Sequence, residues 1–205
     1  MTTENKAYPV TLRGDFTIPP GRWVWIFKWL LGIPHYIVLC FLGIAFIACW
    51  IISFFAILFT GKYPRGLFDF NVGVLRWSWR VGFYSYQALG TDKYPPFSLN
   101  PDPNYPADLE VPYPEKLSQG MVLIKWWLLA IPHWIIVWIF QGGTGGGNAG
   151  LVTILAIINA IYSLFTGKHI PDIFKVVIGM NRWSYRVFAY VSLMRDEYPP
   201  FRLDD

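Results

Sequence analysis

The sequence predicts an all-α integral membrane protein built from two repeated modules, and three observations predict it. Charged residues make up only 15% of the 205 residues, whereas soluble domains carry about 25%. Two long stretches, residues 29–61 and 126–167, contain no Asp, Glu, Lys or Arg. The same series of motifs also occurs twice along the chain, in the same order.

Each uncharged stretch is long enough to cross a bilayer, because a membrane-spanning helix needs about 20 mostly apolar residues. A helix in a soluble core is rarely apolar on all sides for so long. The chain also holds 11 Trp and 12 Tyr, residue types that favour the membrane–water boundary. The first stretch is too long for a signal peptide and lacks a small-residue cleavage site, so we expect membrane helices.

The repeat predicts two modules, at residues 1–100 and 101–205, joined by a Pro-rich and acidic linker at residues 90–116. The repeated motifs, each first copy followed by its echo, are Trp29 to His35 and Trp127 to His133, Phe59-Thr60-Gly61-Lys62 and Phe165-Thr166-Gly167-Lys168, Arg76-Trp77-Ser78 and Arg182-Trp183-Ser184, and Tyr94-Pro95-Pro96-Phe97 and Tyr198-Pro199-Pro200-Phe201. Upstream of them, Tyr8-Pro9-Val10-Thr11-Leu12 is expected to be extended and is echoed from Tyr105 onward.

We expect each uncharged stretch to fold as a transmembrane hairpin. The second stretch is interrupted by a glycine-rich segment, residues 141–150, whose backbone groups would lack partners in hydrocarbon. We therefore expect a solvent-exposed loop there, between legs at about residues 121–140 and 151–166. By analogy, the first stretch should turn near Gly43.

Charge distribution favours hairpins over single spans. Hairpins leave all 17 Lys and Arg on one side of the membrane, which is the positive-inside pattern and makes both termini cytoplasmic. Single spans would scatter these residues over both sides. Each leg of the first hairpin would be only about 28 Å long, against a hydrocarbon core of about 30 Å, so a shallow hairpin is a further alternative.

A basic and aromatic segment follows each stretch and predicts an amphipathic helix at the membrane interface. Arg76 and Arg80 share a helical face with Asp69, and the second module repeats the spacing. Such helices bind anionic headgroups. The candidate lipid- or partner-binding residues are Arg76, Arg80, Lys175, Arg182 and Arg186. The alternatives are a third membrane segment, with arginines facing a polar cavity, and a soluble helix.

His35 and His133 occupy equivalent positions, each after a proline that should kink a helix or begin one. Two such histidines can form a proton or ion site, or hold a haem between the modules. The simpler interpretation is a polar side chain at the headgroup boundary, or one bonded to a freed backbone carbonyl. Asp92 and Asp196 precede the Tyr-Pro-Pro-Phe motifs, which predict rigid straps packing aromatic rings onto the helices, or docking motifs.

No catalytic, nucleotide-binding or metal-binding motif occurs, so the sequence predicts no enzyme, no cofactor and no metal site. Cys40 and Cys49 are about 13 Å apart on a helix, too far for a disulfide. The net charge of +4 follows from the membrane topology and does not indicate nucleic-acid binding.

With these motifs the chain resembles the bacterial membrane-protein family described as domain of unknown function 4389, in two tandem copies. The residues that carry the resemblance are Trp29 to His35, Phe59-Thr60-Gly61-Lys62-Tyr63-Pro64, Leu67-Phe68-Asp69-Phe70-Asn71, Val74-Leu75-Arg76-Trp77, Arg80-Val81 and Tyr94-Pro95-Pro96-Phe97. The second module matches more loosely, since His169-Ile170 replaces Tyr63-Pro64 and Lys175 replaces Asp69. The resemblance implies a bacterial integral membrane protein and implies no activity.

The expected function is that of a non-enzymatic scaffold or accessory subunit in the bacterial cytoplasmic (inner) membrane, as a multi-pass protein. Its expected partners are the lipid bilayer, anionic lipid headgroups, and other membrane proteins or a second copy of the chain. The first alternative is a small transporter or channel with a pathway between the repeats, near His35 and His133. The second is a haem-binding electron-transfer subunit.

Overall fold

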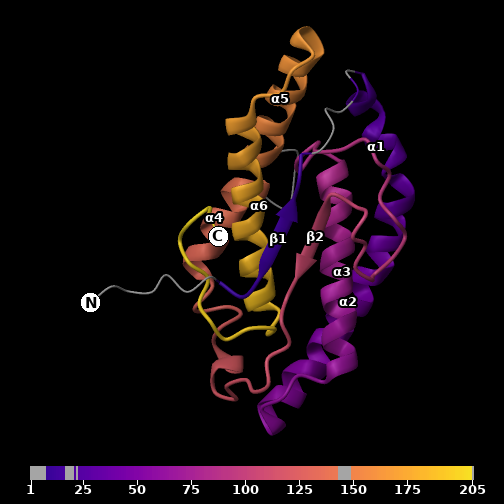
Figure 1. Cartoon of the computed structure of the whole chain (residues 1–205). Coiled ribbons are helices and arrows are strands. Elements are labelled where there is room, and N and C mark those ends of the chain that lie inside the picture. Colours follow the sequence, from indigo (N-terminus) through magenta and orange to yellow (C-terminus); the bar gives the residue numbers. More distant parts are fainter. Residues whose placement is uncertain (1–7, 17–20, 22, 143–148, 205) are drawn as a thin grey trace.

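The computed structural model describes residues 8–16, 21, 23–142 and 149–204. Most of these residues are helical, as the sequence predicts. The prediction of an all-α fold is wrong in one respect, because the N-terminal segments of the two modules pair as a short antiparallel sheet (Figure 1). Strand β1 (Thr11–Gly14) pairs with strand β2 (Ala107–Glu110), with Leu12 opposite Leu109.

The elements form three layers. The strand pair packs on α3 (Arg65–Tyr84) and α6 (Pro171–Val191), and these two helices pack in turn against an outer layer of apolar helices. The outer layer consists of α2 (Ile33–Thr60), α4 (Ile131–Gln141) and α5 (Leu151–Thr166). The short helices η1 (Val24–Phe27), α1 (Lys28–Leu31) and η2 (Met121–Leu123) lead into it.

The first uncharged stretch is one continuous helix from Ile33 to Thr60, so the predicted turn near Gly43 is wrong and the first module contains no hairpin. Helix α2 has 28 residues, about 42 Å at 1.5 Å per residue. No turn forms because Gly43 has neither a proline nor a polar turn residue beside it. A single helical glycine costs only about 1 kcal/mol relative to alanine, too little to interrupt so long a helix.

The repeated motifs mark the helix ends in both modules. Pro34 and Pro132 lie in the first turn of α2 and α4, where a missing N–H costs nothing. Gly61 and Gly167 end α2 and α5 in the left-handed conformation, each with φ of 69°, which glycine adopts without a steric penalty. The prediction that each proline either begins or kinks a helix is therefore confirmed: each proline lies at the beginning of its helix.

The second stretch is interrupted as predicted, but its two legs do not fold back on each other. The predicted leg at residues 151–166 coincides with α5, whereas α4 covers only the end of the other leg. Helix α4 packs through Val137 on the later part of α6, and Asn159 of α5 accepts a hydrogen bond from the N–H of Ile170, where α6 begins. The two helices thus lie end to end along α6 (Figure 1).

Gly150 makes the close junction between α4 and α5. A Cβ atom at this position would lie 2.2 Å from the carbonyl carbon of Gln141, so no residue but glycine fits. The start of α5 therefore lies directly against the end of α4. The predicted solvent exposure of the glycine-rich loop falls on residues 143–148, which lie outside the described residues.

The two modules are interlocked, because strand β2 of the second module covers helix α3 of the first, and strand β1 contacts α6. Leu12 and Leu109 are equivalent positions of the repeat and pair with each other, so an approximate two-fold axis relates the halves. The segment expected to be a linker is part of the core, since Tyr105, Ala107 and Leu109 are all buried.

Candidate functional site

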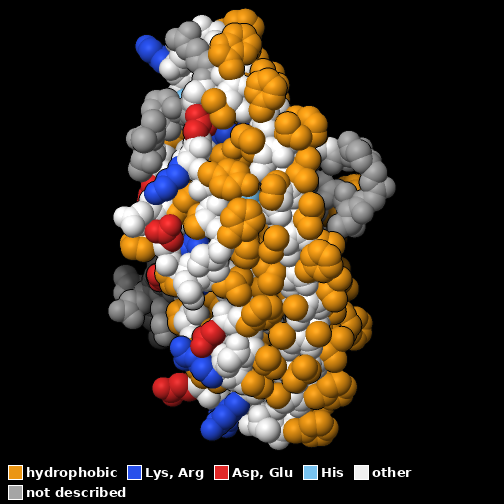
Figure 2. Space-filling model, turned by 90° about the vertical axis from the view of Figure 1, so that its right-hand side faces the viewer, with side chains coloured by type: hydrophobic (Ala, Val, Ile, Leu, Met, Phe, Trp, Pro, Cys, Tyr) orange, Lys and Arg blue, Asp and Glu red, His pale blue; other side chains and the backbone are white. Residues whose placement is uncertain are grey.

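The outer layer exposes an extended apolar face. Only 6% of the most apolar part of α2 is buried, and the equivalent residues Phe59 and Phe165 are 75% and 79% exposed. In Figure 2 apolar side chains cover the surface from one end of the molecule to the other, while charged side chains gather along the opposite flank. Monomeric soluble proteins rarely expose apolar patches above a few hundred Å².

We define the apolar face by the exposed large side chains of α2, α4 and α5. They are Ile33, Tyr36, Ile37, Phe41, Ile44, Ile47, Ile51, Ile52, Phe55, Phe59, Ile131, Trp134, Ile135, Trp138, Ile139, Ile154, Ile158, Ile161, Tyr162 and Phe165. Within the described part of the chain, α2 is the one helix long and apolar enough to cross a membrane, judged by length and composition; α4 and α5 are shorter.

Arg76 and Arg80 lie buried beneath strand β2 instead of facing outward. Oδ1 of Asp108 forms an ion pair with both: it lies 2.9 Å from Arg76 Nε and accepts a hydrogen bond from Arg80 Nη2 at 3.2 Å. The backbone carbonyls of Leu99 and Asn100 accept from the two guanidinium groups, at 3.0 and 2.9 Å. Buried charges require such pairing. The expectation that these two arginines reach lipid headgroups is therefore corrected: they tie α3 to the strand and the strap.

The second module uses its arginines in the same way. Arg182 donates to the carbonyl of Leu203 at 3.1 Å, and Arg186 to the carbonyl of Asp204 at 2.9 Å. Thr11 stands at the position equivalent to Asp108. Of the five predicted binding residues, Lys175 alone is exposed. The prediction that the arginines share a helical face is confirmed, but the prediction that this face is exposed is wrong.

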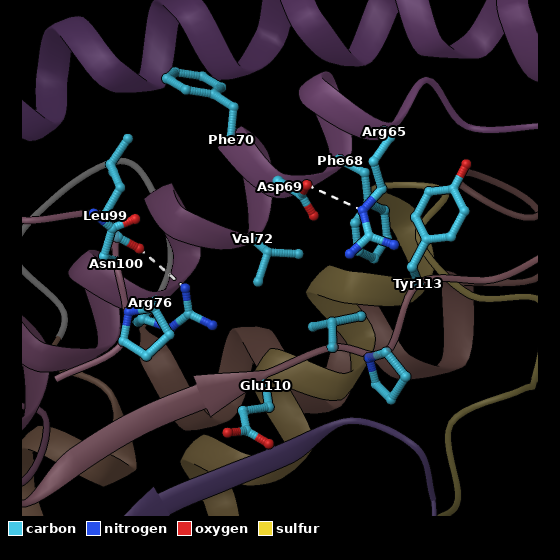
Figure 3. A pocket seen from close by; sticks show the side chains of 13 residues that line it. Arg65, Phe68, Asp69, Phe70, Val72, Arg76, Leu99, Asn100, Glu110 and Tyr113 are labelled. Atoms are coloured by element: carbon cyan, nitrogen blue, oxygen red, sulfur yellow. Dashed lines mark hydrogen bonds and ion pairs between the residues drawn. The ribbon is translucent and has the colours of Figure 1, made fainter. Parts of the chain in front are cut away.

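Two open grooves flank the strand pair, one in each half. The first has a volume of about 790 Å³ and lies between α3 and the chain around β2 (Figure 3). Arg65 at one end bonds to Asp69 at 3.0 Å and covers the ring of Tyr113 at 4.5 Å. Arg76 and Glu110 also line it. The acidic and basic groups are balanced, so the groove selects no ligand charge.

The second groove, of about 670 Å³, is the counterpart of the first. Lys175 occupies the position of Asp69, and Asp204 that of Asn100. The two grooves thus differ in charge at these matching positions: a basic residue replaces an acidic one, and an acidic residue replaces a neutral one.

His35 and His133 each occupy a separate aromatic cluster. Nδ1 of His35 accepts from Nε1 of Trp77 at 3.0 Å, and its ring stacks on Phe97 at 4.0 Å. The second module repeats this arrangement, with distances of 3.1 Å from His133 to Trp183 and 4.4 Å to Phe201.

The structure does not bring the two histidines together. The aromatic rings that contact His35 belong to the first module, and those that contact His133 belong to the second. The contacts of Phe97 and Phe201 confirm the strap interpretation of the Tyr-Pro-Pro-Phe motifs, because each phenylalanine also packs against a tryptophan of α3 or α6.

Two buried lysines form a repeated ion pair that sequence reasoning missed. Nζ of Lys28 lies 2.8 Å from Asp92, and Nζ of Lys125 lies 2.7 Å from Asp196. Both lysine side chains are fully buried. Burial lowers the pKa of Lys28, and the hydrogen bond with Asp92 opposes this. The available signal was one lysine at the start of each stretch and one aspartate before each strap.

Two cavities lie in the contact region between the halves. One cavity there, lined by Trp25, Leu89, Ala156 and His169, has a volume of about 10 Å³, room for about one water molecule. Another, of about 260 Å³, lies between α2, α3 and Thr153 of α5. Neither is lined by His35 or His133.

The described residues contain no group of three or more His, Cys, Asp or Glu side chains that could hold a metal ion. Cys40 and Cys49 are free thiols on α2. Neither groove contains a nucleophile, base and orienting group arranged as catalysis requires.

Comparison with known proteins gives one match. A family model described as domain of unknown function (DUF4389) matches residues 22–98 and 122–202. The two matched segments cover more than half of the chain and fall one in each repeat. Neither a curated protein nor a solved structure matches the chain.

Proposed function

The chain belongs to the family described as domain of unknown function 4389, with two copies in tandem, and from that premise we propose that it is a non-enzymatic scaffold or accessory subunit bound to a membrane. The apolar face is the membrane-binding surface in this proposal. The charged flank, with its two grooves, remains in water and is available to a partner protein. As the positive-inside pattern suggests, we assign this flank to the cytoplasmic side of a bacterial inner membrane.

The exposure of α2 is the observation that carries the proposal. A core helix of a soluble protein is mostly buried, whereas only 6% of the most apolar part of α2 is. Moving one large apolar side chain such as Ile44 out of water is worth about 1.5–3 kcal/mol. The many side chains of the apolar face therefore supply a large driving force toward lipid.

Basic residues at the ends of the apolar face support a preference for anionic lipid. Lys62 follows α2, Lys168 follows α5, and both are exposed. Each lysine near an anionic surface contributes about 1 kcal/mol at physiological salt. These lysines, and not the buried Arg76 and Arg80, are the proposed headgroup contacts.

Vesicle flotation tests the proposal. We expect the purified protein to float with vesicles containing phosphatidylglycerol and to resist a carbonate wash. The double variant Phe41→Glu with Ile44→Glu should lose at least 10-fold in the floating fraction. Thr11→Glu, on the exposed strand surface, is the matched control and should float normally. A wild-type protein that stays soluble and monodisperse beside the vesicles would rule out membrane binding.

A further inference from the structure

The apolar face and the charged strand surface extend along the same direction of the molecule. Helix α3 packs along α2, and strand β2 packs along α3, so all three elements follow the long axis in Figure 1. Whatever depth range α2 occupies in a membrane, α3 and the strands must occupy as well. The orientation of α2 therefore decides where the charged groups lie.

The strand surface is unsuited to hydrocarbon. Arg13 and Asp15 pair at 3.7 Å with side chains 46% and 53% exposed, and Glu110 is exposed beside them. The sheet has two strands, so each strand has an outer edge with backbone groups that no second strand pairs. Lipid-exposed sheet edges do not occur in the hydrocarbon region, and charged side chains are expensive there. A membrane-crossing α2 would place this surface at that depth.

The outer layer is wide enough to lie on a leaflet as a sheet of helices. The two apolar stretches run side by side in opposite directions: Trp126, before α4, contacts Trp50 of α2 at 5.6 Å, and Trp25, before α2, packs on Ala156 and Ala160 of α5. The C-terminal ends of α2 and α5, which Lys62 and Lys168 follow, consequently lie at opposite ends of the molecule (Figure 1).

We propose that the protein lies flat in one leaflet, with α2, α4 and α5 parallel to the membrane plane, and that it does not cross the bilayer. The occupant of the apolar face is thus the acyl-chain and headgroup boundary of a single leaflet. Interfacial helices bury their apolar side about 5–10 Å into this boundary. The inference rests on the proposed membrane binding and adds its geometry, and it replaces the hairpin expectation.

The two lysines at the ends distinguish the orientations. In the flat orientation Lys62 and Lys168 meet headgroups of the same leaflet. If α2 crossed the bilayer, the two would lie on opposite sides of the membrane. Both positions are exposed and follow a helix end, so a cysteine there should leave the fold intact.

The experiment uses the full chain in its host membrane. Lys62→Cys and Lys168→Cys are made separately in a background carrying Cys40→Ala and Cys49→Ala. A membrane-impermeant maleimide is added to right-side-out and to inverted vesicles, with Glu110→Cys as the marker for the side of the strand surface. We expect both cysteines to label in the same vesicle type as Glu110→Cys, at least 10-fold more than in the other type.

Labelling of the two end positions in opposite vesicle types would overturn the flat orientation. If the protein also stayed in the pellet after a carbonate wash, membrane binding would stand and only the orientation would fall. If the protein were absent from washed vesicles and formed oligomers, its apolar face would be covered by other copies, and both proposals would fall.

Discussion

Asp108 is the carboxylate that holds two arginines of helix α3. The sequence predicts that Arg76 and Arg80 share a helical face, because their spacing is local. It does not predict their partner, because Asp108 comes from a strand of the other module and the contact depends on how the chain folds back. Buried position and pairing together explain why these basic residues do not serve as headgroup contacts.

Removal of this carboxylate should destabilise the protein strongly. Asp108→Ala leaves two buried guanidinium groups without their counter-ion, and we expect a loss of about 3–5 kcal/mol in the free energy of unfolding. Thr11→Ala, at the equivalent position of the first strand, is exposed and should change it by less than about 0.5 kcal/mol. Denaturant unfolding in detergent measures both. If both variants lost the same free energy of unfolding, the ion pairs of Asp108 would not be what stabilises this part of the protein.

Two buried tyrosines should make the fold sensitive to high pH. Burial, together with nearby Asp92, raises the pKa of Tyr84 to about 12, and burial likewise raises that of its counterpart Tyr190 to about 12. The unfolded phenols lose their protons near pH 10. The stabilisation is complete below pH 10 and is lost as the pH rises toward 12, because the folded state binds more protons in that window.

Removing these phenols should flatten the alkaline decline. The free energy of unfolding should decrease less steeply with pH in each of Tyr84→Phe and Tyr190→Phe. Between pH 10 and 12 we expect each substitution to reduce this slope by about 1.4 kcal/mol per pH unit. Phenolate absorbance and denaturant unfolding, measured at several pH values, provide the comparison. An unchanged slope in the double variant would refute the assignment to these two residues.

At the scale of elements, prolines and glycines define helix ends that the sequence shows clearly. Pro34 and Gly61 delimit α2, and their repeats delimit the α4–α5 row. Hairpins were expected because the insertion in the second stretch looked like a turn. In the structure α5 begins directly beside the end of α4 and does not fold back along it. The sequence could not distinguish a hairpin turn from an end-to-end junction of two helices, since a glycine-rich, uncharged segment is compatible with both.

Glycine substitutions at the equivalent place in the two modules should have opposite effects. Gly43 has nothing near its missing side chain, so Gly43→Ala should stabilise α2 by about 0.5–1 kcal/mol. Gly150→Ala places a methyl group against the backbone of Gln141 and should destabilise by about 1–3 kcal/mol. Thermal unfolding of both variants in detergent tests this. A stabilising Gly150→Ala would show that α4 and α5 are not closely joined.

At the scale of the whole molecule, the repeat was predictable but its interlocking was not. Matching motifs establish which residues are equivalent, such as Leu12 and Leu109. They do not reveal that the two first strands pair with each other, or that β2 covers α3 of the other module. The concentration of basic residues on one side of a membrane stays a prediction, and a flat orientation satisfies it without requiring any segment to cross.

The depth of positions along the apolar face tests the flat orientation most directly. Spin labels are attached at Ile44→Cys, Phe59→Cys and Phe165→Cys in the background without native cysteines, and depth is measured by oxygen and nickel accessibility in anionic vesicles. We predict one shared depth, about 5–10 Å below the headgroups, and a fully aqueous label at Glu110→Cys. Phe59 and Phe165 in opposite leaflets, with Ile44 at the bilayer centre, would contradict it.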